Sequence, residues 1–491
     1  MTYILAIDQG TTSSRAILFD QHLNAVDMES IPVTQYFPHE GWVEHDPEEL
    51  FQGVLTTAQS VVTRNDALID GELLVGITNQ RETAIVWDVY TGQPVYPAIV
   101  WQSRQTIDIC QDLRVRGLAQ VVREKTGLVI DSYFSASKWR FILDAIPDGQ
   151  DRADRGELLF GTVDSWLIWR LTGGKHFTDQ TNASRTMIWN IHNEDWDEEL
   201  LRELDLPRQC FPEVLTSGGL FGSIPENILG RRATIRAVAG DQQAALFGHG
   251  CFSQGQAKNT YGTGSFILAI AGDTQPELLD GIITTVAASS SRQKKQYVLE
   301  GSIFSAGSTV QWLRDQLGFF EEAAETAEIA SALDDSGGVV MIPGFTGLGS
   351  PHWDEEVRGA FLGINRDTNK FHLIRAGLEA IAQQTSDVID TFVRAGYEIS
   401  ELRVDGGAAA NDWLMQFQAN ILDIPILRAE FLENTARGVA GIAGVEAGII
   451  DSDVMSSRPG GTIFTNEIDP ETRRISRERW AHALKTVREF K

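Results

Sequence analysis

The chain opens with two apolar runs, "YILAI" and "RAILF", separated by the small polar residues Gly10 to Ser14. Such runs on either side of a glycine-containing turn predict a β-hairpin. The pattern recurs in "AKNTYGTGSFILAIAG", Ala257 to Gly272, where a polar approach leads to Gly262 and then to an apolar strand. Gly10 and Gly262 lie 252 residues apart, which favours two duplicated halves. Chance is the alternative, because Gly/Thr/Ser turns between strands are common.

Further along the chain, segments with the apolar pattern of β-strands alternate with segments that have the apolar pattern of α-helices. "LLVGITNQRETAIVWD" predicts a strand, a turn and a second strand. Between Phe371 and Gly396, apolar residues recur at helical spacing, which predicts an amphipathic helix that ends at the glycine. "LRVDGG" predicts a short strand that breaks at Gly406 and Gly407, and a helix over "AAANDWLMQFQANIL" follows. These elements predict an α/β protein whose mixed sheets are covered by helices.

The chain length also bears on domain organisation. At ~150 residues per domain, 491 residues suffice for two to four domains. We predict a first domain over residues 1–249 and a second over 250–491. "VAGDQQAALFGHG", Val238 to Gly250, lies near the midpoint and is our choice for the hinge.

The formal net charge is −27. It argues against nucleic acid and anionic membranes as partners, because both require a net basic face. The widely spaced Cys110, Cys210 and Cys251 form neither a disulfide framework nor a metal-ligand pattern, which fits a reducing cytoplasm. No basic-then-apolar leader and no apolar run of about 18 residues occurs, so we expect a cytoplasmic protein without a membrane span.

An acidic protein can still bind phosphate through a few local hydrogen-bond donors. Backbone N–H groups in glycine turns bind phosphate without net positive charge, and Thr and Ser hydroxyls add donors. The turn at Gly10 leads into a strand and lacks Gly-Lys-Ser/Thr, so it is not a Walker loop. If these turns hold polyphosphate, Asp8 would hold a magnesium ion through water. In the alternative, Asp8 and Thr11 only stabilise the hairpin turn.

Asp241 follows Gly240 where a strand gives way to a helix. Its carboxylate could accept the proton of a hydroxyl that attacks a γ-phosphate, or it could only cap the helix. Gln242 could donate to a substrate oxygen, or it could be a solvated helix residue.

Arg81 and Glu82 are neighbours at a predicted turn. A guanidinium donor beside a carboxylate acceptor suits vicinal hydroxyls, if a strand end or bulge turns both toward one ligand. The alternative is an ordinary surface pair. Trp101 and Tyr133 could add an apolar wall and a phenol for the same polyol, although Trp101 could equally belong to the core.

Ten segments form a specific combination that runs in order over essentially the whole chain: "IDQGTTSSRAILFD", "GWVEHDPEE", "ITNQRETAIVWD", "GTVDSWLIWRLTGG", "DQTNASRTM", "AGDQQAALFG", "NTYGTGSF", "EGSIFSAGSTVQWLRD", "FTGLGSPHWD" and "LRVDGGAAANDWLMQFQ". This combination resembles the glycerol-phosphorylating FGGY carbohydrate kinases, which belong to the actin, hexokinase and chaperone ATPase superfamily. The resemblance implies two ribonuclease-H-like domains with a deep cleft between them, glycerol mainly on the first and ATP mainly on the second.

The resemblance also implies in-line transfer of the γ-phosphoryl group of ATP to glycerol, giving sn-glycerol 3-phosphate, with Asp241 as general base and Mg²⁺ as cofactor. The implied contacts are Arg81, Glu82, Tyr133, Asp241 and Gln242 for glycerol, with Trp101 and Phe266 against its carbon face; Thr11, Thr12, Ser13 and Arg15 for the transferring phosphate; Thr263, Gly307, Gln311, Gly407 and Asn411 for the nucleotide; and Asp8 for magnesium. We also expect a homodimer or homotetramer.

Some positions depart from the pattern of the family. They are Ser103, Ser350, His352, Arg437 and Gly441. None of them is an implied glycerol contact, so they bear on the packing of the nucleotide end and on regulation. In "LGRRATIR", Gly230 and Arg232 align with a fructose 1,6-bisphosphate site of bacterial relatives, and the alternative is a solvated basic loop.

Two other functions compete with this prediction. The chain could be an FGGY kinase for a pentulose or sugar acid, although Arg81, Glu82, Tyr133 and Trp101 favour a small triol. From another class, it could be a conformational ATPase of the actin or chaperone type, which shares the phosphate turns but needs no polyol pocket.

Overall fold

The computed structural model describes residues 2–69, 71–431, 433–451, 454–455 and 460–490. The chain divides into two compact units. Unit 1 comprises Met1–Gly250, Thr284–Tyr297 and Asn434–Ser457, and unit 2 comprises Cys251–Ile283, Val298–Glu433 and Arg458–Lys491. The predicted boundary between residues 249 and 250 adjoins the first junction, but two later segments return to unit 1.

Unit 1 contains a large mixed sheet with helices. Its elements are β1 (Ile4–Gln9), β2 (Ser13–Phe19), β3 (Ala25–Pro32), β4 (Glu44–His45), α1 (Pro47–Arg64), β5 (Leu73–Asn79), β6 (Ile85–Asp88), β7 (Ala98–Ile99), α2 (Ile107–Val115), α3 (Ala119–Thr126), α4 (Ser135–Ala145), α5 (Gly149–Asp154), β8 (Leu158–Gly161), α6 (Val163–Thr172), β9 (Phe177–Asp179), α7 (Gln180–Ala183), β10 (Trp189–Asn190), β11 (Asp195–Trp196), α8 (Glu198–Glu203), β12 (Glu213–Leu215), β13 (Gly218–Ile224), α9 (Glu226–Leu229), β14 (Ala233–Gly240), α10 (Asp241–Gly248), β17 (Ile283–Val286) and α15 (Asn434–Ala447).

The main sheet of unit 1 has the strand order β13-β14-β5-β1-β2-β3. β1 and β2 form the predicted antiparallel hairpin, with Ile4 opposite Phe19. β5 runs parallel to both β1 and β14. In this register Gln9 and Gly240 both lie beside Asn79, so the carboxyl ends of three strands lie at one edge of the sheet.

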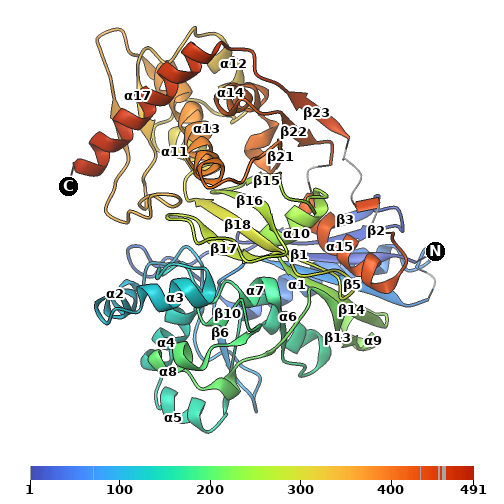
Figure 1. The fold of residues 1–491 in the computed structure, drawn as a ribbon. Coiled ribbons are helices and arrows are strands. Elements are labelled where there is room, and N and C mark those ends of the chain that lie inside the picture. Colours follow the sequence, from blue (N-terminus) through green and yellow to red (C-terminus); the bar gives the residue numbers. More distant parts are fainter. Residues whose placement is uncertain (1, 70, 432, 452–453, 456–459, 491) are drawn as a thin grey trace. The chain divides into compact units, whose positions relative to one another are not determined.

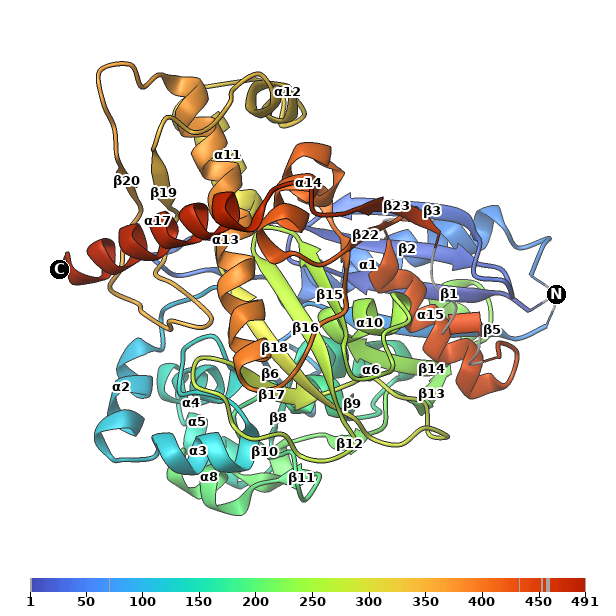
Figure 2. The same cartoon turned by 45° about the horizontal axis from the view of Figure 1, so that its top comes forward.

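Helices cover both faces of this sheet. Val75 and Ile77 of β5 belong to a buried cluster with side chains of α1 and α6. Gly76, between them, faces α15: a Cβ on Gly76 would lie 2.8 Å from the Val439 carbonyl oxygen. Because neighbouring strand residues point to opposite faces, α15 covers the other side, beside β1 and β5 in Figures 1 and 2. This packing explains why residues 434–457 belong to unit 1 rather than to the predicted second domain.

α10 and α15 pack closely through glycines. A Cβ on Gly438 would lie 1.8 Å from the Ala244 carbonyl oxygen, and one on Gly248 would lie 2.1 Å from that of Asn434. Residues 238–249 form the end of β14 and α10, and all but Asp241 are buried. The predicted hinge, Val238 to Gly250, ends where the first segment of unit 1 ends, and its role as a hinge stays a prediction.

Unit 2 has its own mixed sheet and helices. Its elements are β15 (Gln256–Tyr261), β16 (Ser265–Gly272), β18 (Tyr297–Ile303), α11 (Gly307–Asp315), α12 (Glu325–Ser331), β19 (Val340–Ile342), β20 (Ala360–Leu362), α13 (Lys370–Arg394), β21 (Glu401–Asp405), α14 (Asp412–Leu422), β22 (Ile426–Ala429), β23 (Gly461–Phe464) and α17 (Pro470–Glu489).

The unit 2 sheet repeats the strand topology of unit 1. β15 and β16 form the second predicted hairpin, and β15 runs parallel to β21, which runs parallel to β22. Figure 2 shows the long helix α13 beside α11 and α14. The predicted helix end at Gly396 is confirmed: α13 stops at Arg394, and Gly396 has a left-handed φ of +88°.

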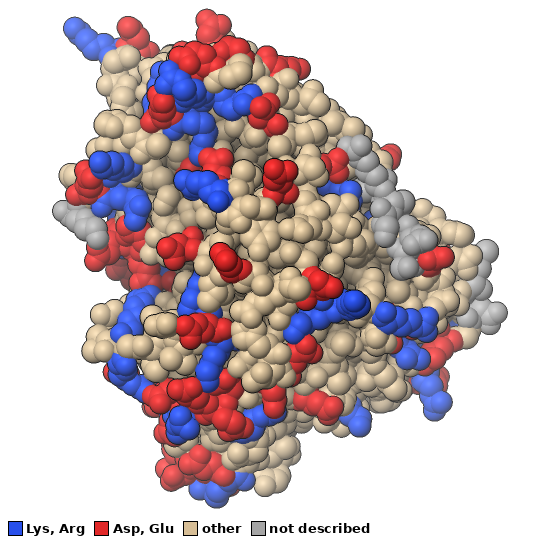
Figure 3. All heavy atoms as spheres, in the orientation of Figure 1, with Lys and Arg blue, Asp and Glu red and all other residues tan. Residues whose placement is uncertain are grey.

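The mixed α/β class and the two-domain organisation are confirmed. Among the residues that the structure describes, no helix is long and apolar enough to cross a membrane. On the face drawn in Figure 3, acidic and basic side chains are interspersed. The excess of acidic residues therefore does not form one continuous acidic patch on this face.

We predict that Gly438→Ala destabilises unit 1. An alanine within a helix ordinarily stabilises by about 1 kcal/mol relative to glycine. Here the added methyl group would force α10 and α15 apart, and we expect a net loss of about 1–3 kcal/mol in the free energy of unfolding. Thermal unfolding followed by circular dichroism measures the change. Gly219→Ala is the control, because its Cβ would meet the Thr216 carbonyl oxygen only at 3.6 Å. A Gly438→Ala protein as stable as wild type contradicts the prediction.

Candidate active site

The first predicted phosphate turn and three of the predicted polyol residues follow the carboxyl ends of three neighbouring strands. β1 ends at Gln9 before the turn at Gly10, β5 ends at Asn79 before Arg81 and Glu82, and β14 ends at Gly240 before Asp241. Ligands of open α/β sheets bind outside the carboxyl ends of parallel strands. The sheet register thus brings together segments that are about 70 and 160 residues apart in the sequence.

Arg81 lies between two carboxylates. Its Nε is 3.3 Å from Asp241 Oδ1 and 3.6 Å from Glu82 Oε1, and its Nη1 donates to Gln243 Oε1 at 3.0 Å. The side chains of Arg81 and Glu82 are each 2% exposed, whereas that of Asp241 is 29% exposed. Arg81 and Glu82 are therefore not a surface pair, and Asp241 presents an accessible carboxylate next to a buried cation.

Asp241 is the first residue of α10, and the N-cap is Gly240. The alternative of Asp241 as the helix cap is therefore wrong. Its Oδ1 accepts a hydrogen bond from the Gln242 backbone N–H at 2.7 Å, and its Oδ2 accepts one from Gln242 Nε2 at 3.0 Å. Gln242 is buried, not a solvated helix residue, and its amide group orients the Asp241 carboxylate.

Tyr133 and Trp101 lie against each other in unit 1. Their ring centroids are 5.7 Å apart in an edge-on arrangement. Tyr133 is buried and Trp101 is partly exposed. Trp101 Nε1 donates to Thr11 Oγ1 at 2.9 Å, so this wall is joined to the first predicted phosphate turn. Phe266, the second residue of β16, is a buried residue of unit 2.

The first phosphate turn is a tight, supported hairpin loop. The Gly10 N–H donates to the Ser13 carbonyl oxygen at 2.9 Å. Gln80 Nε2, from the segment after β5, donates to the Gly10 carbonyl oxygen at 3.2 Å. Thr12 is exposed, and Thr11 and Ser13 are partly exposed, which leaves hydroxyl groups accessible at this turn.

Asp8 and Arg15 face each other across the two strands of this hairpin. They are paired in the β1–β2 register, and Arg15 Nη1 lies 3.9 Å from Asp8 Oδ2. The Asp8 side chain is 15% exposed and the Arg15 side chain 25%. A carboxylate oxygen that water can reach is the donor type that Mg²⁺ prefers, so Asp8 fits the predicted magnesium role.

Two buried basic residues beside the predicted polyol residues were not predicted. Arg185 follows α7, and its Nε donates to Glu82 Oε1 at 2.6 Å. Lys138, in α4, is fully buried, and burial lowers its pKa to about 7. The motif "DQTNASRTM" contained Arg185, but a single arginine in a polar run does not reveal that the fold buries it. Lys138 gave no sequence signal.

The predicted nucleotide residues line one cavity of unit 2. Its volume is about 430 Å³. It is lined by Tyr261, Gly262, Thr263, Gly307, Val310, Gln311, Arg314, Ala323, Ala324, Thr326, Ala327, Leu378, Gly407, Ala408, Ala410, Asn411 and Leu414. All five predicted residues are among them, and the many small and apolar neighbours suit a flat aromatic base.

Backbone contacts shape this cavity. The N–H groups of Gly307 and Ser308 donate to the carbonyl oxygens of Gly262 and Thr263 at 3.0 and 3.1 Å, which fixes the start of α11 against the second hairpin turn. Gly406 has φ +87°, and a Cβ there would lie 2.4 Å from the Tyr261 carbonyl oxygen, so only glycine fits.

Asn411 caps α14 and also lines the cavity. Its Oδ1 accepts a hydrogen bond from the Leu414 N–H at 2.9 Å, and its Nδ2 donates to Thr326 Oγ1 at 3.1 Å. The helix predicted over "AAANDWLMQFQANIL" therefore begins at Asp412 and follows a short 3-10 turn over Gly407–Ala410.

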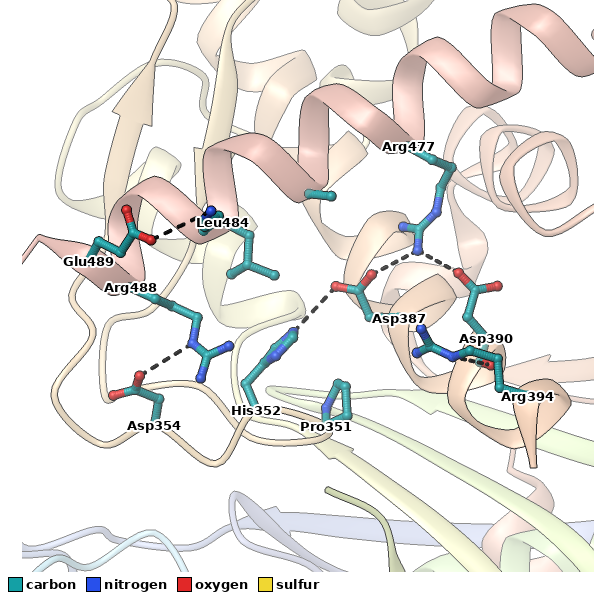
Figure 4. A pocket seen from close by; sticks show the side chains of 12 residues that line it. Pro351, His352, Asp354, Asp387, Asp390, Arg394, Arg477, Leu484, Arg488 and Glu489 are labelled. Atoms are coloured by element: carbon teal, nitrogen blue, oxygen red, sulfur yellow. Dashed lines mark hydrogen bonds and ion pairs between the residues drawn. The ribbon is translucent and has the colours of Figure 1, made fainter. Parts of the chain in front are cut away.

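A second cavity of unit 2, of about 610 Å³, contains the departure His352 (Figure 4). His352 Nε2 lies 3.6 Å from Asp387 Oδ2. Arg477 Nη2 bridges Asp387 and Asp390 at 2.8 and 2.7 Å. Arg, Lys, Asp and Glu side chains line this cavity, and it shares no lining residue with the nucleotide cavity.

The remaining departures make local contacts, and Ser350 is buried with its N–H donating to the Ser302 carbonyl oxygen at 2.8 Å. Ser103 Oγ donates to Gln105 Oε1 at 2.7 Å, and Arg437 Nη1 donates to the Gly248 carbonyl oxygen at 2.6 Å. A Cβ on Gly441 would lie 2.8 Å from the end of the flexible Met455 side chain. Gly230 and Arg232 lie on an exposed turn between α9 and β14.

Comparisons with known proteins cover nearly the whole chain. The N-terminal domain of the FGGY family of carbohydrate kinases matches residues 3–248, and its C-terminal domain matches residues 257–447. A glycerol kinase of Carboxydothermus hydrogenoformans is 48% identical over 99% of this chain and 98% of its own. One of Bacillus cytotoxicus is 47% identical over the full length of both.

Solved structures agree with these relatives. The crystal structure of Plasmodium falciparum glycerol kinase with ADP superposes with a TM-score of 0.91 and 32% identity, over 99% of this chain and 98% of that one. The family models, the full-length relatives and the superposition lead to one assignment. The chain belongs to the FGGY family of carbohydrate kinases.

Proposed function

We propose that this protein transfers the γ-phosphoryl group of ATP to glycerol and forms sn-glycerol 3-phosphate. The observation that carries the proposal is the arrangement in unit 1 of Arg81 between the carboxylates of Glu82 and Asp241, at 3.6 and 3.3 Å. A donor between two acceptors matches adjacent hydroxyl groups, each of which both donates and accepts. The full-length relatives named glycerol kinase support the same substrate.

Each polyol residue has a chemical role in this proposal. Arg81 donates to hydroxyl oxygens and Glu82 accepts from a hydroxyl. Asp241, the more exposed carboxylate, accepts the proton of the hydroxyl that attacks phosphorus. Gln242 orients that carboxylate, and Tyr133 and Trp101 contact the carbon face. Phe266 is proposed for the same apolar wall.

The phosphate and nucleotide contacts complete the proposal. Thr11, Thr12, Ser13 and Arg15 meet the transferring phosphate, and the unit 2 cavity holds ATP through Thr263, Gly307, Gln311, Gly407 and Asn411. Hydroxyls and amides carry most of this binding, which suits a chain with a net charge of −27. A cleft between the two domains stays a prediction.

Asp8 would hold Mg²⁺ through water. The ion would neutralise charge on the phosphate oxygens, which is its usual contribution to phosphoryl transfer. Arg15, 3.9 Å from Asp8, would contact phosphate. We further propose a cytoplasmic homodimer or homotetramer, with Gly230 and Arg232 as a site for fructose 1,6-bisphosphate.

Product formation from ATP with a panel of polyols and ketoses tests the function. We expect kcat/KM for glycerol to exceed that for D-xylulose at least ~100-fold, or ~2.7 kcal/mol in transition-state binding. A preference for a ketose or sugar acid would identify another FGGY kinase. ATP hydrolysis that is indifferent to every polyol would favour the conformational ATPase.

We predict that Asp241→Asn lowers kcat at least ~100-fold, because the amide cannot accept the hydroxyl proton. ADP affinity, measured by calorimetry, should stay within about twofold, since the proposed nucleotide cavity lies in unit 2. Asp195→Asn, an exposed carboxylate in β11 of unit 1, is the matched control and should keep wild-type turnover. Turnover of Asp241→Asn within about threefold of wild type would exclude the general-base role.

We predict that Gly407→Leu weakens nucleotide binding. A Cβ on Gly407 would meet no atom of the described residues within 4 Å, so the larger side chain would occupy the cavity without a backbone clash. We expect the Kd for ADP to rise about 10-fold or more, equivalent to about 1.4 kcal/mol. The KM for glycerol at saturating ATP serves as the internal control and should not change. Unaltered ADP binding would place the nucleotide elsewhere.

A further inference from the structure

Glu82 has a backbone conformation that requires support. Its φ is +60°, in the left-handed region that residues other than glycine seldom adopt. Such a conformation costs about 1–3 kcal/mol and persists only where the surroundings hold it. The Glu82 side chain is also almost completely buried. Both its backbone and its carboxylate therefore need partners.

Helix α4 holds the backbone of Glu82. The Glu82 carbonyl oxygen accepts hydrogen bonds from Ser135 Oγ at 3.1 Å and from Lys138 Nζ at 3.4 Å. Lys138 Nζ also donates to the carbonyl oxygens of Tyr133 and Phe134. The buried Lys138 side chain thus joins the backbone of Glu82 to the segment that carries Tyr133.

Arg185 holds the carboxylate of Glu82. The Arg185 side chain is 0% exposed, and its Nε donates to Glu82 Oε1 at 2.6 Å. Its guanidinium carbon lies 5.3 Å from the Tyr133 ring centroid and 5.2 Å from that of Phe134. A planar guanidinium can pair with a carboxylate and contact an aromatic ring at once, which an ammonium cannot match.

The segment around Arg185 is anchored to the same helix. The Ala136 N–H at the start of α4 donates to the carbonyl oxygen of Thr186, the residue after Arg185, at 2.9 Å. Before Arg185, α7 is capped by the buried Asp179, whose carboxylate accepts from the N–H groups of Thr181 and Asn182. Arg185 therefore extends from a fixed backbone, so its side chain can define where Glu82 lies.

We infer that Arg185 is a positioning residue for polyol binding, because it sets the Glu82 carboxylate relative to the Tyr133 ring. The inference rests on the proposed function, in which Glu82 and Tyr133 contact glycerol. Arg81 lies near both Glu82 and Asp241, whereas Arg185 pairs with Glu82. Because Arg185 also neutralises Glu82, Arg81 can interact with both carboxylates. The competing interpretation is a buried ion pair that only contributes stability.

Arg185→Met tests the inference against a matched control. Arg170→Met removes a guanidinium that also pairs with a glutamate, Glu48 at 2.9 Å, and lies 4.0 Å from the Phe51 ring centroid in the same unit. We expect Arg185→Met to raise the KM and the calorimetric Kd for glycerol at least 10-fold while kcat falls less than about threefold. Arg170→Met should lower only the unfolding temperature.

The pH dependence gives a readout that a purely structural role would not change. Arg185→Met removes a positive charge that stabilises the ionised form of the buried Glu82 carboxylate. The pKa of Glu82 should therefore rise in the variant. The ratio of variant to wild-type KM should therefore be largest near pH 6 and decrease toward pH 9. Among the described contacts, Arg81, Arg185 and Lys138 lie next to Glu82, Asp241 lies next to Arg81, and Tyr133 lies next to Arg185. Burial lowers the pKa of Lys138 to about 7 and the charge of Glu82 opposes this shift, so the two groups titrate together and the pH profile reports on both.

A double-mutant comparison identifies the route of the effect. On a Glu82→Gln background, Arg185→Met should change the KM for glycerol by less than about twofold, because its target carboxylate is already gone. An equal loss on both backgrounds, or wild-type KM and pH profile in Arg185→Met, would overturn the inference. If Arg185→Met does not fold, Arg185→Lys replaces it: a KM at least threefold above wild type supports positioning, and a wild-type KM refutes it. Absence of glycerol phosphorylation by the wild-type protein would instead refute the proposed function.

Discussion

Parallel pairing of β14, β5 and β1 is the constraint on which the candidate active site depends. Because Gln9 and Gly240 both lie beside Asn79, the three strands end at the same level of the sheet. The residues that follow each strand then lie at one edge, whatever their separation in the sequence. α1 and α6 on one face and α15 on the other bury these strands, so the register is held by apolar packing from both sides.

The charges at this edge form an alternating series. Asp241, Arg81, Glu82 and Arg185 follow one another at 3.3, 3.6 and 2.6 Å, so each interior charge lies next to one of opposite sign. Buried charges are tolerated only when paired in this way. The series ends at the partly exposed Asp241 carboxylate. In the proposed function, this accessible carboxylate accepts the proton of a bound hydroxyl.

Unit 2 uses the same topology for a different purpose. Its hairpin of β15 and β16 and the parallel strand β21 repeat β1, β2 and β5, which supports the interpretation of two related halves. Here the segments after the strands are glycines and small residues rather than charges, and a cavity of about 430 Å³ lies beside them. The shared topology thus places a candidate binding site at the ends of equivalent strands in each unit. The size and charge of the side chains there determine what can bind.

Local features could be predicted from the sequence: both hairpins, the helix ending at Gly396 and the helix start at Asp241. The family resemblance also selected five residues that line one cavity of unit 2. Turn chemistry and apolar periodicity act over a few residues, and the ten-segment resemblance added the residue roles. Tertiary structure decided the rest. In the folded chain, α15 belongs to unit 1 and His352 lines a separate cavity. Glu82 has a left-handed backbone conformation, and Arg185 and Lys138 are buried beside it. These outcomes depend on which distant segments share an interior, and no short stretch of sequence encodes such long-range packing and its electrostatic consequences.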